Sequence, residues 1–122
     1  MKVSVITATW NSGATLCDTL ESVLNQTYPD IEHVIVDGGS TDNTMELVRE
    51  YEPRYNGKLR YISEPDKGIY DAMNKGVEMA TGDIIGILNS DDFYTAPDTV
   101  ETLIGELEKH KVDAVFGDIH FV

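Results

Sequence analysis

The chain contains few of the residues that build disulfides, zinc sites or nucleic-acid interfaces. Cys17 is the single cysteine among 122 residues, which excludes an intrachain disulfide and a cysteine-based zinc set and favours a reducing, intracellular compartment. The histidines at 33, 110 and 120 are not spaced as metal ligands. With 9 basic against 22 acidic residues, the formal charge of −13 argues against binding to nucleic acids or to anionic membranes.

Long hydrophobic runs are missing as well. No stretch approaches the ~20 apolar residues of a membrane span, and the apolar run at the N-terminus is too short for a signal peptide. We therefore expect no membrane span. The length and the ordinary composition fit one globular domain, which can bury about two thirds of the surface of its unfolded chain.

Two kinds of apolar periodicity alternate along the chain. Runs typical of strands occupy 3–8, 31–36, 59–62, 84–88 and 112–116, and apolar residues at helical spacing lie between them. This alternation predicts an α/β fold with a mostly parallel sheet and helices on both faces. We expect Ser40 or Thr41 to cap the second helix. We also expect Gly82 to end the third in the left-handed conformation, and Pro97 to lie in the first turn of the fourth.

The segment from Ala80 to Asp92 holds the strongest candidate for a ligand site. Its β-rich run ends in two adjacent carboxylates, Asp91 and Asp92. Ligands of open α/β sheets bind beyond the carboxyl ends of the strands, so this pair can hold a hard cation against a phosphate. An isolated pair of this kind can equally well cap a following helix.

Two other strand ends carry polar groups suited to a nucleotide. The segment TATWN, which follows the first strand, offers exposed backbone and Trp10 for a planar base, although an aromatic residue there more often packs in the core. Asp37 ends the second strand before two glycines, where its carboxylate can accept an N–H from uracil or guanine. Helix capping explains Ser40, Thr41 and Asp42 better than it explains Asp37. We therefore expect Asp37 to contact a ligand.

A further polar motif runs from Glu64 to Gly76. Lys67 leads into a helix, and a helix N-terminus with a nearby lysine suits an anionic group. Asp71 and Asn74 lie three positions apart and share a helical face. The alternative is a solvated turn followed by a polar helix face.

In this order and at these spacings, the motifs TATWN, VDGGSTDNT, EPDKGIYDAMNKG and NSDD resemble the nucleotide-binding half of family 2 glycosyltransferases of the GT-A, Rossmann-like fold. That family includes enzymes of bacterial capsule, exopolysaccharide and colanic-acid-type synthesis. The resemblance runs from Val3 to about Phe116, and the ordered set of four motifs is far more specific than any one of them.

The resemblance implies roles for particular residues. Ala8, Trp10 and Asp37 would line the nucleotide pocket, and Asp91 would lie near the ribose. Asp92, helped by Asp91, would bind a divalent cation, Mn²⁺ or Mg²⁺, that bridges the diphosphate. The implied reaction is a metal-dependent, inverting transfer of a hexose from a UDP- or GDP-linked sugar to a hydroxyl of a sugar or of a lipid-linked acceptor. The implied process is surface polysaccharide biosynthesis. The implied location is the cytoplasm, either free or attached peripherally at the inner face of the membrane.

The chain also departs from the family pattern. Many relatives have proline in place of Ala8, a second aspartate in place of Gly38 and aspartate in place of Asn89. Relatives also often carry an arginine near 70–73, where this chain has none. The acidic motif is thereby reduced to NSDD, which leaves the metal role to Asp92 and Asp91.

Family members continue into an acceptor-binding half that carries the acidic general base. We therefore expect residues 1–122 to be the nucleotide-sugar-binding portion of such an enzyme, with its general base beyond Val122. The apolar residues Ile119 and Phe121, together with Val122, then predict self-association or a disordered tail.

Two other classes of protein are alternatives to a transferase. One is a module that binds a nucleotide sugar without transferring it. The other is a different α/β protein: a receiver domain has an acidic pair directly after the first strand, and a sugar-nucleotide pyrophosphorylase has a Gly- and Arg-rich loop there. This chain has neither pattern.

Overall fold

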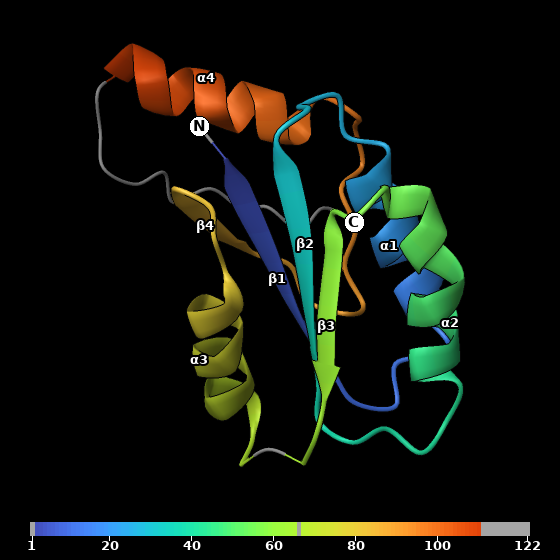
Figure 1. The fold of residues 1–122 in the computed structure, drawn as a ribbon. Coiled ribbons are helices and arrows are strands. Elements are labelled where there is room, and N and C mark those ends of the chain that lie inside the picture. Colours follow the sequence, from blue (N-terminus) through green and yellow to red (C-terminus); the bar gives the residue numbers. More distant parts are fainter. Residues whose placement is uncertain (1, 66, 111–122) are drawn as a thin grey trace.

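The computed structural model describes residues 2–65 and 67–110 and contains a parallel four-stranded sheet in the order β3-β2-β1-β4 (Figure 1). The strands are β1 (Val3–Thr9), β2 (Ile31–Asp37), β3 (Leu59–Ser63) and β4 (Ile84–Ile87). The helices are α1 (Leu16–Leu24), α2 (Thr44–Tyr51), the 3-10 helix η1 (Glu52–Tyr55), α3 (Ile69–Met79) and α4 (Thr99–His110). The predicted α/β class and parallel sheet are confirmed. The strand predicted at 112–116 lies outside the described residues.

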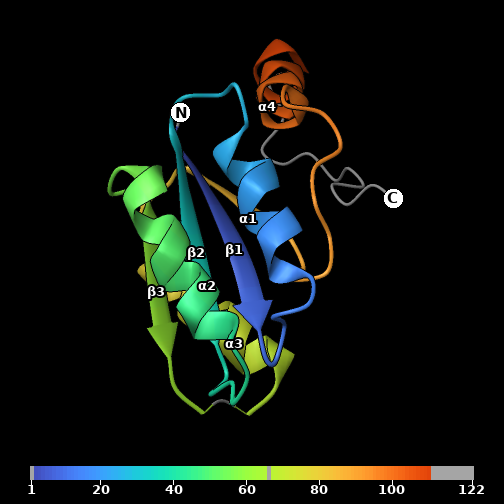
Figure 2. The ribbon, with the colours of Figure 1, turned by 90° about the vertical axis from the view of Figure 1, so that its right-hand side faces the viewer.

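Helices cover both faces of the sheet, as the alternation of elements predicts (Figure 2). On one face, Val5 and Ile35 pack in a core with residues of α1, α2 and α4. On the other face, Ile6 and Val34 pack with Ala72 of α3. Successive side chains of a strand point to opposite faces, so β1 and β2 supply both cores, which explains why apolar residues stand at both odd and even positions of these central strands. No helix in the described ranges has the length and apolar character needed to cross a membrane.

Two glycines allow backbones to approach closely. A Cβ at Gly76 of α3 would lie 2.5 Å from the Cγ2 of Ile6, so α3 can rest on β1 only with glycine there. At Gly82 a Cβ would lie 2.6 Å from the Oγ of Ser4. The prediction that Gly82 ends α3 in the left-handed conformation is wrong, because α3 ends earlier and Ala80 at its C-cap is extended.

The helix starts also differ from the predictions. Neither Ser40 nor Thr41 caps α2, which begins at Thr44 with Asn43 at its N-cap. Pro97 precedes α4 rather than lying in its first turn, and its carbonyl accepts a hydrogen bond of 2.7 Å from the backbone N–H of Thr27.

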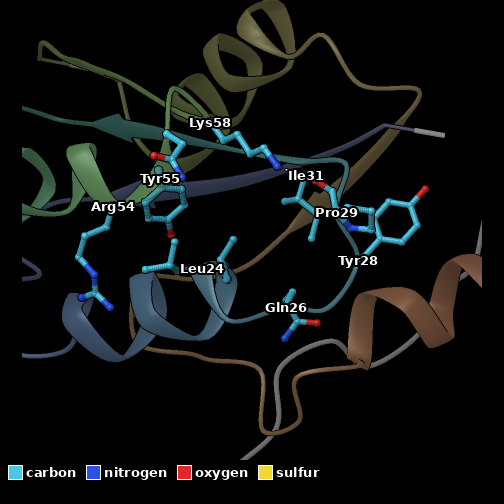
Figure 3. A pocket seen from close by; sticks show the side chains of 10 residues that line it. Leu24, Gln26, Tyr28, Pro29, Ile31, Arg54, Tyr55 and Lys58 are labelled. Carbon is cyan, nitrogen blue, oxygen red and sulfur yellow. Dashed lines mark hydrogen bonds between the residues drawn. The ribbon is translucent and has the colours of Figure 1, made fainter.

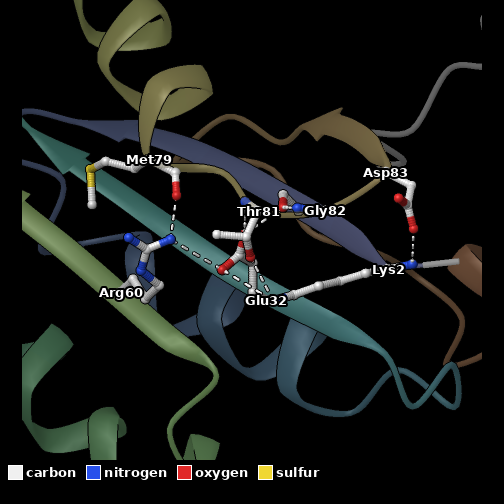
Figure 4. Close-up of polar contacts among 8 residues, drawn as sticks. Lys2, Glu32, Arg60, Met79, Thr81, Gly82 and Asp83 are labelled. Atoms are coloured by element: carbon white, nitrogen blue, oxygen red, sulfur yellow. Dashed lines mark hydrogen bonds and ion pairs between the residues drawn. The ribbon is translucent and has the colours of Figure 1, made fainter.

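Glu32 ties the amino-terminal ends of the strands together (Figure 4). Its carboxylate is only 3% exposed and accepts hydrogen bonds from the Ser4 hydroxyl at 2.5 Å and from the backbone N–H of Thr81 at 2.6 Å. It also pairs with Arg60 at 3.4 Å and with Lys2 at 3.8 Å. Burial alone would raise the pKa of Glu32, but the hydrogen bonds from Ser4 and Thr81 lower it to about 2. The buried carboxylate at this end of the sheet is therefore satisfied by donors of the protein itself.

His33 is buried in the core and forms part of a hydrogen-bonded chain. Its Nε2 lies 2.8 Å from the Thr7 hydroxyl, and its Nδ1 lies 3.1 Å from the Tyr55 hydroxyl. The Tyr55 hydroxyl donates to the Leu20 carbonyl at 2.7 Å, so it accepts from Nδ1–H, and Nε2 accepts from Thr7. Burial lowers the pKa of His33 to about 3, so the imidazole is neutral in the folded protein.

This buried imidazole predicts a loss of stability in mild acid. The unfolded chain protonates His33 near its ordinary pKa, whereas the folded protein does not, so stability is full above about pH 6.5 and falls as the pH drops below it. The slope due to His33 should approach about 1.4 kcal/mol per pH unit. Urea unfolding of the wild type and of His33→Gln between about pH 7.5 and about pH 5 measures this slope. An equal slope in both proteins would assign the acid lability to other groups.

Candidate functional site

The predicted site residues gather where the strands end, at the lower edge of the sheet in Figure 1. The parallel register pairs Thr9 with Asp37 and Asp37 with Ser63. Three polar side chains from three strands therefore lie in one row at the carboxyl edge of the sheet. Loops lead from this row to the helices, which is the usual location of a ligand site in an open α/β sheet.

Asp37 is the centre of this row and is fully buried. One carboxylate oxygen accepts from the hydroxyls of Thr9 at 2.7 Å and Ser40 at 2.5 Å. The other accepts from the backbone N–H groups of Gly39 at 3.1 Å and Ser40 at 2.8 Å, and from the Ser63 hydroxyl at 2.8 Å. These five hydrogen bonds occupy the acceptor positions of the carboxylate. These contacts make Asp37 the anchor of the loop, and the ligand contact that the sequence predicts for it stays a prediction.

The charge of Asp37 is stabilised by its surroundings. Burial alone would raise the pKa of this carboxyl group, but the hydrogen bonds from Ser40, Thr9 and Ser63 outweigh burial and hold the pKa below its usual value. The carboxylate is therefore ionised at neutral pH. A base N–H that reaches it must compete with these donors. The sequence did not predict that the hydroxyls of Thr9, Ser40 and Ser63 bind Asp37.

The loop after β1 is fastened to the loop after β2. Asn11 has a left-handed backbone (φ 48°), and its side-chain oxygen accepts from the backbone N–H groups of Thr41 at 2.8 Å and Asp42 at 3.2 Å. Asp42 in turn accepts from the backbone N–H groups of Gly13 and Thr44, each at 3.0 Å. The two loops therefore hold each other in one conformation before any ligand binds.

A pocket of about 450 Å³ opens between the loop after β1 and the loop after β4. Ala8 and Asp91, both predicted to contact the nucleotide, line it together with Asn11, Ser12, Ala14, Thr15, Asn89 and Ser90. Trp10 belongs to the same loop as Ala8, and 67% of its surface is exposed, which leaves its ring available for stacking. The structure thus brings Ala8 and Asp91 to one pocket. Trp10 follows Ala8 by two positions, on the loop after β1.

Asp91 and Asp92 lie on a turn just after β4. The backbone N–H of Asp92 donates to the Asn89 carbonyl at 3.0 Å, and the Asn89 side-chain NH₂ donates to the Asp92 carboxylate at 3.2 Å. Asp91 is exposed and Asp92 is partly buried. Neither side chain caps α4, which begins further along the chain at Thr99. The helix-capping alternative for this pair is therefore excluded.

The donor set of this turn fits a cation that is shared with a phosphate ligand. Within the described ranges, no group of three or more His, Cys, Asp or Glu side chains could enclose an ion by itself. Mg²⁺ and similar ions, however, are often held by one or two carboxylates, with phosphate oxygens and waters completing the shell. Asp91 and Asp92 supply that number of carboxylates beside the pocket.

The start of α3 is less suited to an anion than the sequence suggests. The Asp71 carboxylate accepts from the backbone N–H of Lys67 at 3.0 Å, so an acidic side chain already occupies this helix N-terminus. Lys75 pairs with Asp71 at 3.4 Å and with Glu64 at 3.1 Å. These contacts favour the alternative of a polar helix face.

A smaller pocket of about 190 Å³ lies between the end of α1 and η1 (Figure 3). Its two cationic side chains are already engaged: Arg54 pairs with Glu21 at 2.6 Å, and the Lys58 amine donates to the Pro29 carbonyl at 2.7 Å. None of the predicted site residues lines this pocket.

Known proteins share this sequence pattern. The sequence model of the family described as Glycosyl transferase family 2 matches residues 4–122. A PGL/p-HBAD biosynthesis glycosyltransferase of Mycobacterium bovis is 38% identical over 117 residues, which cover 95% of this chain and 46% of that protein. Chondroitin synthase of Escherichia coli is 39% identical over 107 residues, which cover 88% of this chain and 15% of the synthase.

Solved structures share the fold. TarS 1-349 of S. aureus in complex with UDP-GlcNAc superimposes with a TM-score of 0.81 at 29% identity, over 91% of this chain and 32% of that chain. The mannosyltransferase PcManGT from Pyrobaculum calidifontis, in complex with GDP-Man and Mn²⁺, has a TM-score of 0.81 at 31% identity, over 87% of this chain and 32% of that chain. The GT-A, Rossmann-like fold implied by the motifs is thus confirmed.

The chain spans less than half the length of these curated relatives. The family match nevertheless extends over nearly every residue, and the motifs that carry it lie on strand ends, on the loops after them and on the first turns of α3. This chain belongs to glycosyl transferase family 2.

Proposed function

We propose that this chain binds a nucleoside-diphosphate sugar for transfer of the sugar to an acceptor hydroxyl in surface polysaccharide biosynthesis. The observation that carries the proposal is the pocket at the carboxyl edge, which Ala8 and Asp91 line together. Trp10 follows β1 and Asp37 is the last residue of β2, so both lie at the same edge. The similarity to TarS bound to UDP-GlcNAc and to PcManGT bound to GDP-Man supports a nucleotide-sugar donor and leaves both uracil and guanine as candidate bases.

The proposed reaction is an in-line attack of the acceptor hydroxyl on the anomeric carbon of the donor. The bond to the diphosphate breaks, and the configuration at that carbon inverts. Asp92 and Asp91 would hold a divalent cation, Mn²⁺ or Mg²⁺, which neutralises charge on the leaving nucleoside diphosphate when bound. The presence of Mn²⁺ in the PcManGT complex supports this assignment. The loops after β1 and β2 orient the donor.

We place the general base, which takes the proton of the acceptor hydroxyl, beyond Val122. The relatives are more than twice as long as the aligned segment, and the family resemblance assigns the base to an acceptor-binding half. Residues 1–122 are then the donor-binding portion of a longer hexosyltransferase.

Calorimetric titration with UDP and with GDP, each with and without Mn²⁺, tests the pocket, the base and the metal together. We expect one nucleotide to bind more tightly, with a gain in affinity from Mn²⁺. The 122-residue chain should bind donor without transferring the sugar, whereas a protein that continues past Val122 should transfer it. Binding by both proteins with transfer by neither would instead favour a nucleotide-sugar-binding module.

Asp92→Ala tests the metal assignment. The carboxylate lies on a surface turn, so its removal should leave the fold intact and abolish most of the affinity gained from Mn²⁺, by about tenfold or more. The matched control is Glu50→Ala, which removes one negative charge from an exposed position on α2. An unchanged gain from Mn²⁺ in the Asp92 variant, measured by the same titration, would contradict the assignment.

Asp37→Asn separates contact with the base from support of the loop. If Asp37 accepts a base N–H, the variant should bind the nucleoside diphosphate about tenfold more weakly, with a much smaller change for Mn²⁺–pyrophosphate, which has no base. Ser63→Ala is the control, because it releases one acceptor position of Asp37 and keeps the charge. Equal losses for both ligands would mean that Asp37 acts only by holding the loop.

A further inference from the structure

Thr19 is a fully buried residue of α1 whose hydroxyl bonds outside its own helix. A threonine within a helix commonly donates to the carbonyl of the preceding turn. The Thr19 hydroxyl instead lies 2.5 Å from the carbonyl oxygen of Asp92 and 3.1 Å from that of Ser90, and its proton is shared between them. Ser22 on the same helix shows the ordinary arrangement, donating to the Thr19 carbonyl at 2.9 Å.

Two neighbours of Thr19 make contacts to the same turn. Thr15 lies one helical turn earlier, on the same face, and its hydroxyl donates to the Ser90 carbonyl at 2.9 Å. The Ser12 hydroxyl lies 3.0 Å from the Ser90 hydroxyl. In Figure 2 the segment that leads to α4, drawn in orange, runs alongside α1. Hydroxyls from α1 and the loop before it therefore fasten the turn that carries the two acidic residues.

The fastened carbonyls bracket the acidic residues. The Ser90 carbonyl belongs to the peptide group before Asp91, and the Asp92 carbonyl belongs to the peptide group after Asp92. Because a peptide group is planar, fixing these two carbonyls fixes the backbone directions from which both carboxylates project. The segment between β4 and α4 belongs to no helix or strand, and within the turn the backbone N–H of Asp92 donates to the Asn89 carbonyl.

We propose that Thr19 is a positioning residue for the divalent cation: its buried hydroxyl holds the peptide groups on either side of Asp91 and Asp92, so that the two carboxylates are preorganised for an ion shared with the diphosphate. This inference rests on the proposed function. Helix α1 supplies no carboxylate to that ion. Through Thr19 it nevertheless controls the affinity of the acidic turn for the ion. Groups that orient metal ligands typically change metal affinity by about 10–100-fold when they are removed.

The test uses Thr19→Val, which keeps the branched shape and removes the donor, and Thr19→Ser, which restores the hydroxyl. Ser22→Ala is the matched control, because its hydroxyl bonds within α1. UDP and GDP binding is measured with and without Mn²⁺, and amide hydrogen exchange of the turn is measured without ligand. Thr19→Val should reduce the affinity gained from Mn²⁺ by about 10–100-fold and speed exchange at Asp92, whereas the other two variants should match the wild type.

The outcomes separate this inference from the proposed function. A wild type that gains no affinity from Mn²⁺ would overturn the proposed metal role together with this inference. A wild-type gain that persists in folded Thr19→Val, or equal losses with and without Mn²⁺, would overturn the inference alone. If Thr19→Val does not fold, Thr15→Val removes a separate hydrogen bond to the Ser90 carbonyl from an exposed position. It should speed amide exchange of the turn and lower the affinity gained from Mn²⁺, and an unchanged gain in this folded variant would overturn the inference.

Discussion

The parallel register of β1, β2 and β3 is the constraint on which the rest of the structure depends. It places Ser4 opposite Glu32 at one end of the sheet and Thr9 opposite Asp37 at the other. A slip of one residue would send each strand's side chains to the opposite faces, and both carboxylates would lose the hydroxyls that stabilise their charge. The same register also aligns apolar side chains of neighbouring strands on each face of the sheet, where the helices pack against them.

The two ends of the sheet use buried carboxylates for different purposes. Glu32 joins the strands to one another and to the segment before β4, and the hydrogen bonds and ion pairs around it satisfy its charge. Asp37 joins strand ends to the loop after β2, and that loop is fastened to Asn11, which lines the open pocket. The whole chain is strongly acidic, so a diphosphate approaching the open edge meets repulsion that a divalent cation would relieve. This charge balance connects the composition of the chain to the proposed metal requirement.

Hydroxyl groups, more than charged groups, hold the loops of the candidate site in place. Ser40 and Thr41 read as helix caps in the sequence, but Ser40 donates to Asp37, and the backbone of Thr41 binds the side chain of Asn11. Serine and threonine bond locally or across the fold with similar ease, so their partners depend on which segments are brought together. Fixed loops of this kind reduce the ordering that a ligand would otherwise have to impose, which favours tight and specific binding.

The order of strands and helices, the two-sided sheet and the edge at which the polar motifs meet can all be predicted from the amino-acid sequence, because periodicity and strand-end chemistry are local properties. The family resemblance in turn points to Ala8 and Asp91, which line the pocket. The folded structure is needed to see that Asp37 is surrounded by protein donors and that Thr19 binds the turn at Ser90, 71 positions away. Such contacts arise from register and helix packing between distant segments, and no local pattern in the chain encodes them.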